Sequence, residues 1–141
     1  FPPHRRWKGA QTPVARHAAM TLLIREEWVP TQDEFDAFAR VSGDDNPIHV
    51  DAAFSARTRF GRTVSHGMLI YSKLWALVNR ARPGQRHHFQ SLMFPNPTYA
   101  GEPVLLEIKE TPEGHLAVLA TRKADQLIVL QGQAELEAQA Q

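Results

Sequence analysis

GMLIYSKLWALVNRAR, residues 67–82, is the longest apolar periodic segment of this 141-residue chain. Its apolar residues occupy most of the circumference of a helix, so the pattern predicts a helix that is deeply buried. Pro83-Gly84 ends the helix, because proline cannot continue a helix and glycine readily leaves one. A helix of this kind needs other elements to cover it, and the sequence on either side indicates what they are.

Five segments read as strands, one before the helix and four after it. Turn-forming residues separate the later strands, and one of them has apolar residues on both of its alternating faces, which predicts cover on both sides. The predicted strands are 20–29, 87–94, 103–110, 115–123 and 127–137. A buried helix followed by a strand meander predicts an α+β fold, in which a curled antiparallel sheet wraps around the long central helix. We expect one domain over residues 20–141 and an irregular N-terminal arm over 1–19.

Two shorter helices are predicted between the first strand and the long helix. Thr31 and Glu34 form a capping box, and an apolar stripe at helical spacing follows them, so we expect a helix over 32–42. Gly43 is well placed to end it. Asp51 is placed to cap a second helix over 52–58.

Composition excludes several classes of function. The formal net charge is +1, which gives no support for a nucleic-acid surface, and no apolar run approaches the ~20 residues that span a bilayer. The chain has no cysteine, which excludes disulfides, thiolate zinc sites and a cysteine nucleophile. No apolar region follows the basic N-terminal residues, so we expect no secretory signal and a reducing, cytoplasmic location.

The run SGDDNPIH, residues 42–49, carries the most informative polar residues. Asp44 and His49 lie five positions apart on a segment that Pro47 makes rigid. A carboxylate and an imidazole in one cavity can hold and deprotonate a water molecule. The same pattern, Asp followed by Asn-Pro, is also a common capping and turn sequence, and spacing alone favours that structural interpretation.

The run RTVSHGM, residues 62–68, leads directly into the long helix. Gly67 falls in the first turn, where a free backbone N–H and the helix dipole favour a developing negative charge. Alternatively, Gly67 only allows helix and sheet to pack closely. His66 by itself is more typical of a hydrogen-bonded structural histidine than of a catalyst.

Residues 42–49 resemble the signature of the MaoC-like family, also known as R-specific enoyl-CoA hydratases. Residues 60–68 (FGRTVSHGM) resemble the next block of that family, and the similarity of layout covers roughly residues 20–137. Near Gly101, Glu102 stands where the family more usually has aspartate. The resemblance implies a hot-dog fold, a homodimer or dimer of dimers, and an active site at the subunit interface.

The resemblance also assigns roles to individual residues. It implies that Asp44 and His49 are catalytic, that the Gly67 N–H contacts the thioester carbonyl, and that Asn46 supports the site. We expect His66 to be a second supporting residue. Asp45 receives no role. The implied reaction is reversible hydration of a trans-2-enoyl thioester to an (R)-3-hydroxyacyl thioester, with coenzyme A or acyl carrier protein carrying the acyl group and with no separate cofactor or metal.

Arginine outnumbers lysine twelve to four, and two arginine clusters are candidates for phosphate contacts. One cluster lies just before the second family block and the other at the end of the long helix; their members are Arg57, Arg59 and Arg62, and Arg80, Arg82 and Arg86. Each of these side chains is also compatible with a solvated basic face. Tyr71 and Trp75, one turn apart, are candidates for lining an acyl pocket or for plain core.

Other functions remain open from the residues alone. A dehydratase for branched or dicarboxylic acyl groups shares the same motif. A hot-dog thioesterase would not need the run at 42–49, and a non-catalytic acyl-binding subunit would be free to lose Asp44 and His49. A metal site formed by Asp44, His49 and His66 matches no familiar ligand spacing.

Overall fold

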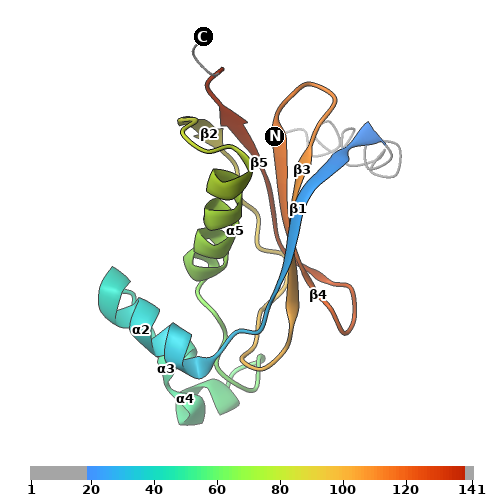
Figure 1. Ribbon diagram of the computed structural model, residues 1–141. Helices are drawn as coiled ribbons and strands as arrows, with labels where there is room; N and C mark the ends of the chain where they lie inside the picture. The colour runs from blue at the N-terminus through green and yellow to red at the C-terminus, as the bar shows by residue number, and fades with distance from the viewer. Residues whose placement is uncertain (1–18, 139–141) are drawn as a thin grey trace, which may run out of the picture.

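The computed structural model describes residues 19–138, in which a five-stranded antiparallel sheet is the largest feature (Figure 1). Its strands are β1 (Thr21–Trp28), β2 (His87–Gln90), β3 (Val104–Glu110), β4 (Leu116–Arg122) and β5 (Ile128–Leu136). They lie in the order β1-β3-β4-β5-β2. The three strands after residue 103 therefore form a continuous meander, while β1 and β2 occupy the two edges.

The long helix α5 (Gly67–Ala81) lies along one face of this sheet (Figure 1). Alternate residues of the central strands face it and are almost fully buried, namely Val104, Leu106, Ile108, Leu116, Val118, Ala120 and Leu130. Leu74 and Leu77 of α5 have no exposed surface and pack into the same cluster. The predicted α+β layout, a central helix against a curled antiparallel sheet, is confirmed.

The burial of α5 differs from the prediction. Leu69, Leu74 and Val78 face the sheet and are buried, but Met68 and Trp75 are about half exposed, at 52% and 48%. The prediction that most of the circumference is buried is therefore wrong for the single chain, because the sheet covers only one side of the helix. The apolar composition of the other side is unexplained by the contacts within one chain.

Three short helices lie together at one end of the sheet (Figure 1): α2 (Gln32–Ser42), α3 (Pro47–Val50) and α4 (Ala52–Ala56). The predicted capping box is present, since Thr31 accepts from the N–H of Glu34 and Glu34 accepts from the N–H of Thr31. Glu34 also accepts from Trp28 Nε1 at 3.0 Å and from Lys73 Nζ at 2.7 Å. This one carboxylate therefore ties α2 to both β1 and α5.

Two local predictions need correction. The segment 47–50 forms a helical turn that was not predicted as a helix, because Asn46 caps it and Pro47 occupies its first position. The strand predicted over 87–94 ends at Gln90, and beyond it Met93 forms only an isolated bridge with Gln131 of β5. A Cβ on Gly132 would overlap the Ser91 carbonyl oxygen, so the chain lies too close to β5 there for regular pairing.

The remaining strand and helix bounds agree with the predictions within one or two residues. In β4, Leu116, Val118 and Ala120 are buried and the alternate residues are half-buried. No helix within residues 19–138 is both long enough and apolar enough to cross a membrane. All but the last residue of the predicted N-terminal arm lies outside the described residues.

Candidate active site

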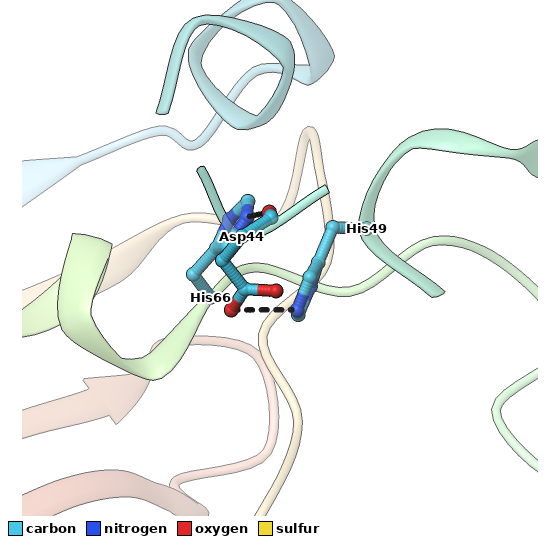
Figure 2. A group of neighbouring side chains, drawn as sticks. All are labelled: Asp44, His49 and His66. Atoms are coloured by element: carbon cyan, nitrogen blue, oxygen red, sulfur yellow. Dashed lines mark hydrogen bonds and ion pairs between the residues drawn. The ribbon is translucent and has the colours of Figure 1, made fainter. Parts of the chain in front are cut away.

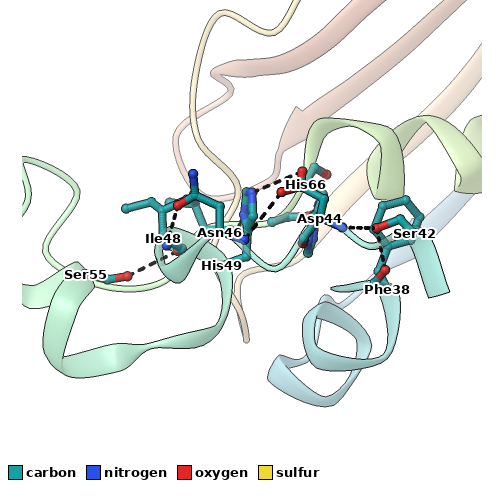
Figure 3. Close-up of polar contacts among 10 residues, drawn as sticks. Phe38, Ser42, Asp44, Asn46, Ile48, His49, Ser55 and His66 are labelled. Atoms are coloured by element: carbon teal, nitrogen blue, oxygen red, sulfur yellow. Dashed lines mark hydrogen bonds and ion pairs between the residues drawn. The ribbon is translucent and has the colours of Figure 1, made fainter. Parts of the chain in front are cut away.

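The segment that carries Asp44 begins where α2 ends. Gly43 adopts a left-handed conformation (φ 82°), which turns the chain away from the helix axis. The Ser42 hydroxyl donates to the Phe38 carbonyl at 2.7 Å and accepts from the Asp44 N–H at 3.1 Å. Asn46 then accepts from the Ile48 N–H and caps α3 (Figure 3). The capping interpretation of the Asn-Pro sequence is confirmed. The capped turn also carries Asp44 and His49, which lie on either side of Asn46 in the sequence.

The second family block lies against this segment. The Val64 N–H donates to the Ile48 carbonyl at 3.0 Å, and the Val64 carbonyl lies 2.9 Å from His49 Nδ1. His66 Nε2 lies 2.8 Å from the Asp44 carbonyl (Figure 3). Residues 15 to 22 positions apart are thus connected by three polar contacts, all of which involve a backbone atom.

Asp44 and His49 face one another across a short gap. Asp44 Oδ2 lies 3.8 Å from His49 Nε2 (Figure 2). Because the Val64 carbonyl only accepts, we assign the proton of neutral His49 to Nδ1, which leaves a lone pair on Nε2. Two acceptors cannot hydrogen-bond to each other, but at this separation they can share one water molecule that donates to each.

The environments of the two groups differ. The Asp44 side chain is 57% exposed, whereas that of His49 is 13% exposed. The carboxylate is therefore reached by solvent, and the imidazole is held inside by its contact with Val64. A water molecule between them would be supplied from the open side.

His66 lies behind this pair and is 2% exposed. Its ring stacks on that of His49, with centroids 3.8 Å apart and planes inclined by 22°. Burial lowers the pKa of His66; a proton on His49 opposes its charging, and the Asp44 carbonyl only partly compensates. His66 is therefore neutral near pH 7.

Gly67 is the first residue of α5, and the helix has no side-chain cap at that end. No hydrogen bond from its N–H is found within residues 19–138. A Cβ at this position would lie 2.7 Å from Cε1 of Phe94. Close packing therefore explains the glycine, and the free N–H at the positive end of the helix is compatible with that explanation.

A cavity of about 540 Å³ opens beside these groups, a volume in the range of small-molecule sites. Its polar lining comes from Asp44, His66 and Gly67 together with Ser42, Arg59, Ser65, Asn96 and Thr98, and His49 is not among the lining residues. Apolar side chains from α2, α5, β5 and the loop after β2 form the rest, including Phe38, Ile70, Phe94 and Val129. The cavity therefore places an apolar chamber next to Asp44, one member of the pair.

One of the five predicted substrate-binding residues lines this cavity. Arg59 lines it, but Arg57, Arg62, Tyr71 and Trp75 do not. Arg62 pairs with Glu102 and stacks over Tyr99 at 4.0 Å, whereas Arg57 lies over Phe54 at 6.0 Å. The Tyr71 hydroxyl donates to Gln90.

The second arginine cluster, at the end of α5, pairs with glutamates. The partners of Arg80, Arg82 and Arg86 are Glu26, Glu110 and Glu137.

Sequence reasoning missed the contribution of residues 94–98 to the cavity. Phe94 and Thr98 line it from the loop between β2 and β3, and the Thr98 carbonyl accepts from the Ser65 N–H at 2.8 Å. The family resemblance covered this region without indicating a role in the site. No local pattern could reveal it, because the contact joins segments more than 30 residues apart.

Asp44, His49 and His66 place potential metal-ligating atoms within 4.8 Å of one another. A metal ion lies close to the plane of each imidazole that binds it. The two rings here are stacked and nearly parallel, so one ion cannot lie in both planes near the nitrogen atoms. The geometry therefore suits proton transfer better than metal binding.

The model of the MaoC like domain family matches residues 10–124. This chain belongs to the MaoC-like family. An (R)-specific enoyl-CoA hydratase from Aeromonas caviae is 39% identical over 94 residues, which cover 63% of this chain and 70% of that protein. A mitochondrial 3-hydroxyacyl-[acyl-carrier-protein] dehydratase from Arabidopsis thaliana is 30% identical over 130 residues, which cover 83% of this chain and 78% of that protein.

Solved structures of MaoC-like proteins agree with the fold. The unliganded R-hydratase PhaJ1 from Pseudomonas aeruginosa has a TM-score of 0.74 and 29% identity, over 84% of this chain and 80% of that one. The A. caviae (R)-hydratase has the same TM-score and identity, over 82% of this chain and 93% of that one. The hot-dog fold implied by the sequence resemblance is therefore confirmed.

Proposed function

We propose that this protein catalyses the reversible hydration of trans-2-enoyl thioesters to (R)-3-hydroxyacyl thioesters. The observation that carries the proposal is the 3.8 Å gap between Asp44 Oδ2 and His49 Nε2, beside the uncapped start of α5. The family membership and the hydratase and dehydratase relatives support the same class of reaction, a carbon–oxygen lyase acting on acyl thioesters.

Asp44 and His49 would hold one water molecule through its two O–H groups. Either Asp44 or His49 removes a proton from this water molecule while the water oxygen attacks C3 of the enoyl group. The same proton is then returned to C2 on the same face, so the pair ends in its starting protonation state. Net addition places OH on C3 and H on C2, and the reverse sequence is dehydration.

Gly67 would stabilise the charge that develops on the thioester oxygen. Attack at C3 pushes electron density onto that oxygen and forms an enolate. The free N–H of Gly67 lies at the positive end of α5, and an oxyanion donor of this kind contributes about 3–4 kcal/mol to the transition state. Asn46 supports the site indirectly, because its cap on α3 aims His49.

The acyl chain would occupy the apolar part of the cavity, and Arg59 at its edge is the arginine best placed to meet the phosphates of a carrier. We include coenzyme A and acyl carrier protein as carriers. Relatives of both kinds are found, among them the 3-hydroxybutyryl-CoA dehydratase of Methylorubrum extorquens, which is 36% identical over 121 residues.

We further propose that two chains associate. Large apolar side chains are exposed on α5 and around the edge strand β2, including Met68, Trp75, Phe89, Met93 and Phe94. Light scattering is expected to give twice the 15.9 kDa mass of the chain, or four times that mass for a dimer of dimers. A monomer at micromolar concentration would contradict this.

The experiment follows the absorbance of the enoyl-thioester chromophore with crotonyl-CoA and with a longer trans-2-enoyl-CoA. Wild-type protein should consume both chromophores, and Asp44→Asn should lower kcat by about 10²–10⁴-fold because it removes a proton acceptor. Asp45→Asn is the matched control, since Asp45 is the exposed neighbour with no part in the pair. Coupling the product to an (R)-specific or an (S)-specific 3-hydroxyacyl-CoA dehydrogenase tests the stereochemistry.

Folded wild-type protein that leaves both chromophores unchanged would refute the hydration of straight-chain enoyl-CoA. Equal losses in the two Asn variants would refute the role of Asp44. Release of free coenzyme A without formation of a 3-hydroxyacyl thioester would instead indicate a thioesterase.

A further inference from the structure

The side chain of His66 does not do what a residue at the start of a helix usually does. His66 is the N-cap of α5, a position whose side chain commonly accepts from the N–H groups of the first turn. Here it makes no such bond, and Nε2 instead lies 2.8 Å from the Asp44 carbonyl. The helix start is thus left free, and the side chain is committed to the segment that carries the carboxylate.

The partners of His66 determine where its proton lies. The Asp44 carbonyl can only accept, so Nε2 carries the hydrogen. Nδ1 is buried and has no partner within the described part of the chain. A second proton on Nδ1 would therefore place an unsatisfied donor and a positive charge inside the protein, next to His49. The lowered pKa of His66, caused mainly by burial, agrees with this tautomer.

The faces of the ring are occupied as well. His49 stacks at 3.8 Å, and Phe38 of α2 lies at 4.8 Å with its plane tilted by 58°. The imidazole therefore sits between α2 and the His49 ring and cannot turn without disturbing them. Its orientation toward Asp44 is set by packing.

We propose that His66, as a neutral imidazole protonated at Nε2, is a positioning residue that sets Asp44 relative to both His49 and the Gly67 N–H. The residue is covalently adjacent to Gly67, stacked on His49 and hydrogen-bonded to the Asp44 backbone. The inference rests on the proposed hydratase function, because it concerns the geometry of that reaction.

The contribution of the His66 Nε2–H donor can be separated from that of the His66 ring by substitution. His66→Gln keeps an N–H the same number of bonds from Cβ as Nε2 and loses the ring. His66→Phe keeps a ring that can stack on His49 and loses the donor. His115→Gln and His115→Phe are the matched controls, since His115 lies in the β3–β4 turn at the far end of the sheet from α2–α4 (Figure 1).

With crotonyl-CoA, His66→Phe should lower kcat by about 10²-fold, because small displacements of a catalytic group are that costly. KM should stay within about threefold of wild type, since the apolar side chains that line the cavity are unchanged. His66→Gln should recover at least about tenfold of the lost kcat through the restored donor. Both His115 variants should match wild type.

A merely structural His66 would behave differently. Its replacement would lower the melting temperature while folded His66→Phe kept wild-type kcat, and that outcome overturns the proposal. Loss of kcat in His66→Gln equal to that in His66→Phe also overturns it, because the donor would then be irrelevant.

Nitrogen-15 NMR of the wild-type imidazoles tests the tautomer without any variant and decides the matter if His66→Phe does not fold. We expect a protonated Nε2, an unprotonated Nδ1, and no titration of His66 at the usual histidine pKa, with His49 and Asp44 as the titratable groups that face it. An Nδ1–H tautomer, or ordinary titration, overturns the proposal. Inactive wild-type protein with the expected tautomer would refute the proposed function and the positioning role with it. If wild-type protein is active, a failed tautomer or variant test refutes the positioning role of His66 alone.

Discussion

The sheet with α5 and the segment 42–67 are held together by different forces. In the sheet and α5, side chains such as Leu74 and Ile108 have no exposed surface, and packing of apolar groups supplies the stability. The segment 42–67 buries little apolar surface: α3 has no buried residue, α4 buries only Ser55, and Val64 is the one apolar side chain of the segment that is buried. Its shape depends on hydrogen bonds to backbone carbonyls.

This difference implies that stability and catalysis can be perturbed separately. Removing an apolar side chain from the core should cost free energy of unfolding. Removing a polar group from the segment 42–67 should cost turnover, because few apolar contacts depend on it. Substitutions at four positions test that separation.

His49→Asn is expected to have the largest effect on turnover. The Asn side chain can place an N–H where Nδ1 donates to the Val64 carbonyl, but it offers no base at the Nε2 position. We expect kcat for hydration to fall about 10²–10⁴-fold while the melting temperature changes little. A large loss of stability with retained turnover would contradict the division between the two regions.

Leu74→Ala tests the other region. Leu74 is fully buried between α5 and the sheet, so the substitution should lower the free energy of unfolding by about 2–5 kcal/mol. Turnover of the folded fraction at low temperature should stay near wild type. Val41→Ala is the control, because Val41 is 85% exposed on α2 and should change stability by less than about 0.5 kcal/mol.

Gly67→Ala tests the position where the segment 42–67 meets α5. The new Cβ would lie 2.7 Å from the Phe94 ring, and overpacking of this kind costs about 1–3 kcal/mol. The backbone N–H is retained, so the loss of turnover should come from displacement. The double variant Gly67→Ala/Phe94→Ala should therefore recover turnover relative to Gly67→Ala; measuring kcat and stability for the full double-mutant cycle checks this. Additive losses would contradict the steric explanation.

Glu34 should give the smallest effect, visible in the pH dependence of stability. Burial raises its pKa, but hydrogen bonds from Lys73 and Trp28 outweigh burial, so the pKa is lowered overall. A lowered folded pKa stabilises the protein above the unfolded pKa of about 4.3, and this contribution is lost as pH falls through the folded value. Urea unfolding of Glu34→Gln from pH 7 to pH 3 should show a shallower decline than wild type. Glu113→Gln, at an exposed turn position, should follow wild type.

Much of the fold was predictable because its signals are local. The capping box at Thr31, the glycine that ends α2 and the alternation along β4 each depend on residues within one turn or one strand. Asp44 and His49 were found as candidates for the same reason, since five positions and one proline separate them on a single short segment.

The sequence by itself therefore determined the α+β class, most helix and strand bounds, and the two groups that face the proposed water molecule. Only the tertiary structure decided that the Val64 carbonyl assigns the tautomer of His49, that His66 stacks behind it, and that Phe94 covers Gly67. These contacts join residues 15 to 27 positions apart through backbone carbonyls and ring faces. Every residue except proline has the same backbone donor and acceptor, so the identity of an amino acid does not show which distant carbonyl it will meet.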